Sequence, residues 1–224
     1  MKINQGFFVA FEGIDGSGKS TQSHLFYKKL KKLGYQVSHT RSEEKDGDII
    51  SPINRSIKAI THNPDYKELI GVETEVMLYM AQGAQSTNEL IIPELQKGSI
   101  VIADRYIYSV YALSHYGRNI DFNLLKEIGD FTTHNLIPDV IVLTDVPANV
   151  AFHRKEKSGK KLGRKELMGP DFFEKVRQGF LKMSKELNPD KWLVVDDNNL
   201  SIDEAEKYIW DSIMPKILDR REIL

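Results

Sequence analysis

The 224-residue chain contains no cysteine, and its formal net charge is only −1. Without cysteine there can be no disulfides, thiolate metal sites or cysteine nucleophiles. So small a net charge attracts the chain neither to nucleic acid nor to anionic membranes, and we expect neither as a partner. No apolar run approaches the length of a membrane span, and the first residues lack the cleavage site of a secretory signal. We therefore expect a soluble, cytoplasmic protein.

Short apolar segments alternate with segments of helical pattern. The apolar segments are residues 7–11, 99–103, 140–143 and 192–195, and residues 35–40 are a further short strand candidate. The main helical patterns cover 52–60, 68–96, 120–134 and 172–187. Fully apolar strands between helices are typical of a parallel sheet that is covered on both faces. The pattern predicts an α/β three-layer sandwich that forms a single domain over residues 1–224.

Residues 13–20 read GIDGSGKS and match the phosphate-binding pattern G-x-x-x-x-G-K-[ST]. The glycines let backbone N–H groups turn toward a phosphate chain, and the following helix directs its positive end there. Lys19 can reach the outer phosphates, and the Ser20 hydroxyl can hold Mg²⁺. A chance glycine-rich turn would lack the strand before it and the helix after it. We predict a site for ATP and Mg²⁺, with binding residues Gly13, Ile14, Asp15, Gly16, Ser17, Gly18, Lys19, Ser20 and Thr21.

Asp104 and Arg105 directly follow the apolar segment 99–103. Ligands of open α/β sheets bind at the carboxyl ends of the strands. There Asp104 can bind Mg²⁺ and act in catalysis, and Arg105 can clamp a phosphate. The alternative is a surface ion pair without a role in binding.

The segment 154–165 is strongly basic, with seven Lys or Arg, one Glu and two Gly. It has little to bury, and we expect it to belong to a mobile basic lid over about 154–170 that closes on ATP. Arg164 is the first candidate for the cation at the transition state and Arg154 the next, while the lysines around them carry no specific assignment. A solvated charged face is the alternative. Two further features each leave two interpretations open. Arg41 either contacts a phosphate or faces solvent. Residues 196–199 either line an adenine pocket or form a plain turn.

The chain resembles the thymidylate kinase family over most of its length. The resemblance lies in FEGIDGSGKSTQ at 11–22, Thr40-Arg41, Asp104-Arg105-Tyr106, PDVIVL at 138–143, LGRKE at 162–166 and DFFEKVR at 171–177. It implies a parallel five-stranded sheet, a homodimer, and phosphorylation of thymidine monophosphate (dTMP) by Mg·ATP. It further implies that Asp15 lies near the acceptor sugar and the transferred phosphate, that Arg41 and Arg105 hold the acceptor phosphate, and that Arg164 is the lid arginine.

Two departures from the family pattern concern the acceptor. The family's P-G-G-T after Thr40-Arg41 is absent, and Gly83 stands where an arginine would read the pyrimidine. Tyr79 can still stack on a base, and Gln82 or Gln85 could supply the missing hydrogen bonds. The alternatives are a related kinase for another nucleotide or a deoxynucleoside, and a P-loop hydrolase or switch. The N-K-x-D tetrapeptide of GTPase switches is absent.

Overall fold

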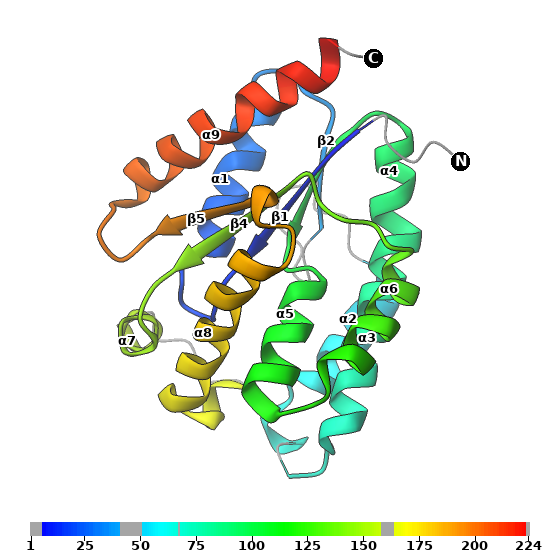
Figure 1. The fold of residues 1–224 in the computed structure, drawn as a ribbon, viewed down its shortest axis with the longest axis vertical. Coiled ribbons are helices and arrows are strands. Elements are labelled where there is room, and N and C mark those ends of the chain that lie inside the picture. Colours follow the sequence, from blue (N-terminus) through cyan, green and yellow to red (C-terminus); the bar gives the residue numbers. More distant parts are fainter. Residues whose placement is uncertain (1–5, 41–50, 67, 158–163, 223–224) are drawn as a thin grey trace.

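The computed structural model describes residues 6–40, 51–66, 68–157 and 164–222. Its centre is a five-stranded sheet in the order β2-β3-β1-β4-β5, and every pairing is parallel (Figure 1). The strands are β1 Phe7–Glu12, β2 Val37–Thr40, β3 Ile100–Asp104, β4 Val140–Asp145 and β5 Trp192–Asp196. The prediction of a five-stranded parallel sheet is confirmed.

Helices cover both faces of the sheet, because neighbouring residues of each strand point to opposite sides. Phe8 and Ala10 of β1 belong to one hydrophobic cluster, and Val9 and Phe11 to the other. The second cluster is closed by α1 Lys19–Lys32 and α9 Ile202–Glu222 (Figure 1). The helices over the other face include α3 Val72–Ser86, α5 Ile107–Tyr111, α6 Phe122–Thr133 and α8 Pro170–Glu186. The three-layer arrangement is as predicted.

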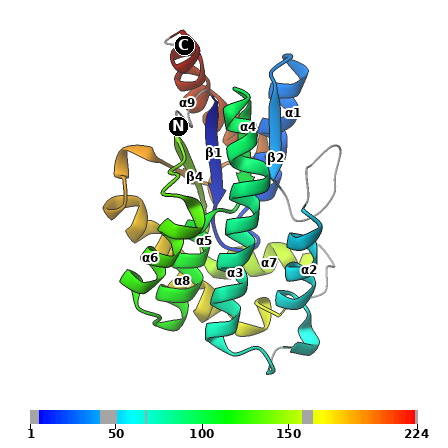
Figure 2. The ribbon, with the colours of Figure 1, turned by 90° about the vertical axis from the view of Figure 1, so that its right-hand side faces the viewer.

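The predicted helix 52–60 is α2 Pro52–Thr61, which begins at a proline after the N-cap Ser51. The predicted helix 68–96 is α3, a π-helical turn Thr87–Ile91 and α4 Ile92–Gln96 in succession. Figure 2 shows α2, α7 Ala148–Lys157 and the start of α3 at the end of the molecule opposite the two termini. The parallel strands finish toward this end, so the polar segments that follow them gather there.

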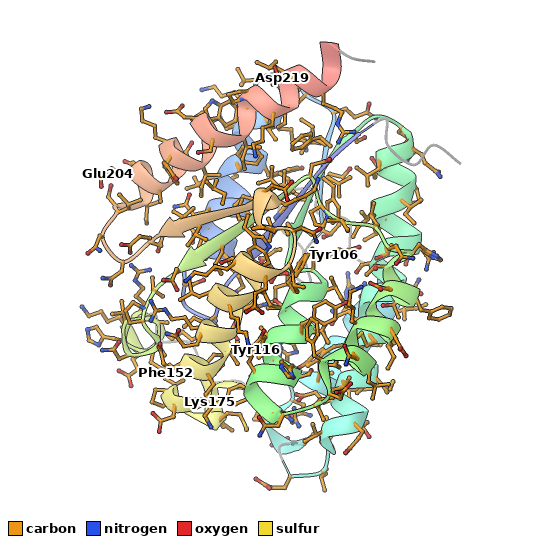
Figure 3. All side chains as sticks on the ribbon, viewed as in Figure 1. Tyr106, Tyr116, Phe152, Lys175, Glu204 and Asp219 are labelled. Carbon is orange, nitrogen blue, oxygen red and sulfur yellow. The ribbon has the colours of Figure 1, made fainter. Side chains whose placement is uncertain are left out.

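The last helix, α9, is amphipathic. Ala205, Ile209, Ile213 and Ile217 are buried against the sheet, whereas Glu204 lies at its outer surface (Figure 3). Among the helices of the described part of the chain, none has both the length and the apolar character that crossing a membrane requires.

Residues 107–116, for which the sequence pattern predicted no element, form α5 and a π-helical turn Ala112–Tyr116. Residues 107–114 of this segment are all buried. A helix that is buried all round shows no apolar period, so its sequence cannot be distinguished from other buried structure. Tyr106, just before α5, packs edge-on against Phe8 with 5.0 Å between ring centroids, where α5 meets the sheet (Figure 3).

Glu12, at the end of β1, is a fully buried carboxylate that fixes the start of α5. One oxygen accepts a hydrogen bond from the Tyr106 backbone N–H at 2.9 Å, and the other accepts from the Ser109 hydroxyl. Burial raises the pKa of Glu12 to about 7, although Ser109 and Arg105 act to lower it. A side chain from β1 thereby holds the segment after β3 in place.

Replacing this carboxyl group, Glu12→Gln, should change how stability depends on pH. The pKa of Glu12 rises from its ordinary 4.5 to about 7 on folding, so the folded protein binds the proton more tightly. Glu12 therefore stabilises the fold below pH 4.5, and that contribution is lost as the pH rises toward 7. Urea unfolding at pH 5 and pH 7.5 should show that the wild type loses about 2 kcal/mol of unfolding free energy relative to the variant. If the unfolding free energies of wild type and variant differ by the same amount at pH 5 and at pH 7.5, this prediction is wrong.

Candidate active site

The glycine-rich loop 13–18 between β1 and α1 curls tightly. Gly13, Gly16 and Gly18 have φ angles of 141°, 89° and 91°, which other residues rarely adopt. A Cβ at Gly16 would lie 2.4 Å from the Ala151 carbonyl oxygen, so the loop also packs too closely on α7 for any side chain there. No acidic residue occupies the first turn of α1, and its positive end is left for an anion.

A cavity of about 800 Å³ opens beside this loop at the carboxyl ends of the strands. It is bordered by α1, α2, α3, α5, α7 and the segment after β5. Among the residues predicted from sequence, those that line it are Asp15, Gly16, Gly18, Lys19, Ser20, Thr21, Tyr79, Asp104, Arg105 and Arg154. The structure thus brings the predicted ATP, metal and acceptor residues together in one cavity.

Of the other residues predicted from sequence, Gly13, Ile14, Ser17 and Arg164 are not among those that line this cavity. Ile14 is buried, and Ser17 is within hydrogen-bond distance of the Thr144 hydroxyl, at 2.7 Å, so both support the loop from behind. Arg41 lies outside the described residues, as do residues 158–163 of the expected lid. Neither the role of Arg41 nor the mobility of the lid is tested.

Asp15 stands between two cations. Its Oδ1 lies 3.2 Å from Lys19 Nζ and 2.5 Å from an Nη of Arg105. Burial acts to raise the pKa of Asp15, but Arg105 and Lys19 outweigh burial and hold this pKa well below its usual range. Asp15 is therefore ionised at neutral pH and orients both cations.

Arg105 is held in a left-handed backbone conformation, with φ 79°. Such a conformation is unfavourable for a side-chain-bearing residue and persists only where its surroundings fix it. Here the Arg105 N–H donates to the Phe11 carbonyl at 2.9 Å, and its guanidinium donates to the Gly13 carbonyl at 2.9 Å. The strain directs the side chain back across the end of β1, toward Asp15.

Cations outnumber carboxylates on the described wall of the cavity. Its acidic residues are Asp15, Asp104 and Asp197, and its basic residues are Lys19, Lys58, Arg105, Arg154, Lys155 and Lys165. Such a surface suits a polyanion such as a nucleoside triphosphate. Among the described residues no group of three or more His, Cys, Asp and Glu side chains could hold a metal ion. The Ser20 hydroxyl and the Asp104 carboxylate are oxygen donors of the type that Mg²⁺ takes, and the rest of its shell would come from water or phosphate.

Asp197 lines the cavity from the turn after β5, within residues 196–199, for which the sequence predicted either an adenine pocket or a plain turn. Its carboxylate accepts from Arg154 at 2.6 Å, and its carbonyl accepts from the same guanidinium at 2.8 Å. Burial raises the pKa of Asp197, although Arg154 opposes this. The pair joins α7 to the loop after β5 at the edge of the cavity. The available signal was its place at the carboxyl end of a strand.

Helix α3 forms the wall that carries Tyr79, Gln82 and Gly83, the residues considered above for contact with an acceptor base. Tyr79 lines the cavity, and its hydroxyl donates to Glu75 at 3.2 Å. One turn further on, a Cβ at Gly83 would meet no atom within 4 Å, so the arginine position of the family is open space here. Gln82 lines the cavity, whereas Gln85 donates to Glu89 at 2.6 Å and is not part of the wall. Of the two glutamines, only Gln82 is placed to read a base.

Arg164 and Lys165 face different surroundings. Arg164 is buried, pairs with Glu75, and donates to the Ile70 carbonyl at 3.2 Å. It is not among the residues that line the cavity, whereas Lys165 is. Lys165 was treated as one of several unassigned lysines in the sequence. Its ammonium lies 4.3 Å from the centre of the Tyr79 ring.

Comparison with known proteins agrees with this geometry. The family model for thymidylate kinase matches residues 11–209. The thymidylate kinase of Kosmotoga olearia is 35% identical over 202 residues, which cover 90% of this chain and 92% of that protein. That of Thermosipho africanus is 38% identical over 198 residues, or 88% of this chain and 92% of the relative. The chain belongs to the thymidylate kinase family.

Proposed function

We propose that this protein transfers the γ-phosphoryl group of ATP to dTMP. One observation carries the proposal: the phosphate-binding loop and the acceptor residues Arg105 and Tyr79 line the same cavity. A donor on the loop and an acceptor against Tyr79 would meet near Asp15. Holding two substrates in line is most of what a phosphotransferase must do. The family of the chain, and the names of its relatives, support dTMP as the acceptor.

The proposed roles follow from position. Loop residues 13–21 and Arg154 bind ATP, with Lys19 at its outer phosphates. Ser20 and Asp104 hold Mg²⁺, which neutralises phosphate charge when bound. Asp15, Arg41, Arg105 and Tyr79 bind the acceptor, and the transition-state role of Arg164 stays a prediction. We further propose that residues 1–224 act as one kinase domain with a lid over about 154–170, in the cytoplasm, where ATP is available.

We propose a homodimer built through α6 and the neighbouring α3. The side chains of Leu124 and Phe131 on α6 are 50% and 81% exposed, and they lie seven residues apart on one helix face. Met77 of α3 is 52% exposed. Apolar helix faces of this kind are self-complementary across a two-fold axis, and a second copy of the chain would cover them.

The kinase proposal is tested by mixing protein, Mg·ATP and each ribo- or deoxynucleoside monophosphate in turn. ADP should form quickly only with the right acceptor, and dTMP should give the highest kcat/KM. Lys19→Met should lower kcat at least about 100-fold, because it removes a cation at the transferred charge. Circular dichroism serves as the control for folding. Rapid ADP formation without any acceptor would indicate a hydrolase instead.

The open space at Gly83 predicts loose selectivity for the acceptor base. Shape and stacking alone discriminate bases by about 1–3 kcal/mol, so we expect deoxyuridine monophosphate to be accepted as well as dTMP. Gly83→Arg should raise selectivity for dTMP over dCMP about tenfold or more, because guanidinium donors suit a carbonyl and repel an amino group. Gly83→Met is the control, since it fills the space without donors. Equal selectivity in both variants would show that the base is read elsewhere.

The proposed dimer face gives a third test. Phe131→Glu places a charge in the apolar face and should shift the protein to a monomer in light-scattering measurements at about 10 μM, since burying an unpaired charge is costly. Leu218→Glu is the matched control. Leu218 is also a large apolar residue at the surface, 47% exposed, but it lies on α9 and not on the proposed interface. A monomeric wild type, or a Phe131→Glu variant that stays dimeric, would exclude this interface.

A further inference from the structure

All the hydrogen bonds and ion pairs that the structure shows for the Arg164 guanidinium go to other groups of the protein. Its guanidinium pairs with Glu75 and donates to the carbonyls of Ile70, at 3.2 Å, and Tyr66, at 3.4 Å. Glu75 in turn accepts from Arg118 at 2.6 Å. Breaking a buried pair of this kind is strongly unfavourable, because it leaves buried charge uncompensated. Arg164 therefore fixes the chain before α8 to the beginning of α3.

Lys165 has the opposite surroundings. It is 9% exposed, and it lines the cavity. Within the described part of the chain its ammonium contacts the Tyr79 ring but forms no ion pair with a carboxylate. Burial lowers the pKa of Lys165 to about 8, although Asp15 acts to raise it. An ammonium that has lost water without gaining a counter-ion is poised to bind an anion.

The groups that act on Lys165 locate that anion. The charges that act on Lys165 are Asp15 and Glu75, which attract the ammonium, and Arg105 and Lys19, which repel it. Arg105 and Lys19 already share the Asp15 carboxylate. Glu75 is likewise shared by two other cations, Arg164 and Arg118, so neither carboxylate can compensate Lys165 as well. A phosphoryl group that passes between two phosphates can, because its charge is spread over its outer oxygens.

We propose that Lys165, and not Arg164, is the catalytic cation that contacts the transferred phosphoryl group, while Arg164 is a positioning residue that holds Lys165 over the cavity. This rests on the proposed kinase function. A phosphate oxygen of the acceptor attacks the γ-phosphorus, the bond to the β–γ bridging oxygen breaks, and its electron pair leaves with ADP. Lys165 donates hydrogen bonds to an outer oxygen of the γ-phosphoryl group and keeps its proton throughout.

The test compares Lys165→Met and Lys165→Arg with wild type, using whichever monophosphate the wild type phosphorylates best. Lys165→Met should lower kcat about 100-fold or more, with both KM values within about threefold, because the contact forms mainly in the transition state. Lys165→Arg should restore at least about a tenth of the wild-type kcat, since it returns a cation of similar reach. Lys182→Met, an exposed lysine on α8, is the matched control and should match the wild type.

Arg164→Gln separates positioning from direct contact. It should lower the unfolding temperature along with kcat, because Glu75 loses a buried partner, whereas Lys165→Met should leave the unfolding temperature at or above that of the wild type. A Lys165→Met variant with near-normal kcat would overturn the proposal, as would an Arg164→Gln variant with normal stability and the larger loss of kcat. A best acceptor other than dTMP would overturn the proposed substrate alone, since the Lys165 comparison stands with any acceptor.

Discussion

The site depends on the pairing of β1 with β3. Their parallel register sets Phe11 beside Asp104, so the segments that follow the two strands leave the sheet at the same edge. Glu12 and Arg105 then cross the gap in opposite directions, one toward the start of α5 and the other toward the glycine-rich loop. These contacts join residues about 90 positions apart in the chain, and without them neither Asp15 nor Arg105 would have a fixed position.

A site that brings several cations together in this way is electrostatically unfavourable when no substrate is bound. Lys19, Arg105 and Lys165 repel one another, and burial lowers the pKa of both lysines. Substrate phosphates relieve this repulsion, so part of the binding energy comes from compensating a charge excess that the fold itself maintains. The anchored Arg164, which does not line the cavity, keeps its own charge compensated by Glu75. The chain thus separates cations that hold its structure from cations that face the ligand.

Sequence predicted the fold well, because the information is local. The apolar segments at 7–11 and 140–143 predicted the strands, and GIDGSGKS predicted the loop between β1 and α1. The sequence did not predict α5, because this helix is buried on all sides and its residues show no helical alternation of apolar and polar side chains. In the site, the contacts of Glu12 and Lys165 could not be predicted from the sequence, for another reason. Arg164, and not its neighbour Lys165, is anchored in the protein interior because it pairs with Glu75, 89 positions earlier in the chain. No local sequence pattern contains that information.

The empty volume beside Gly83 has a consequence for chemical intervention. A nucleotide analogue with an added group on the base edge that faces α3 would fit here, because nothing lies within 4 Å of where a side chain would begin. The same analogue would collide with the long side chain that kinases of the arginine-bearing type place there. A cavity distinguished by a missing side chain can therefore be addressed by a ligand that supplies the missing bulk.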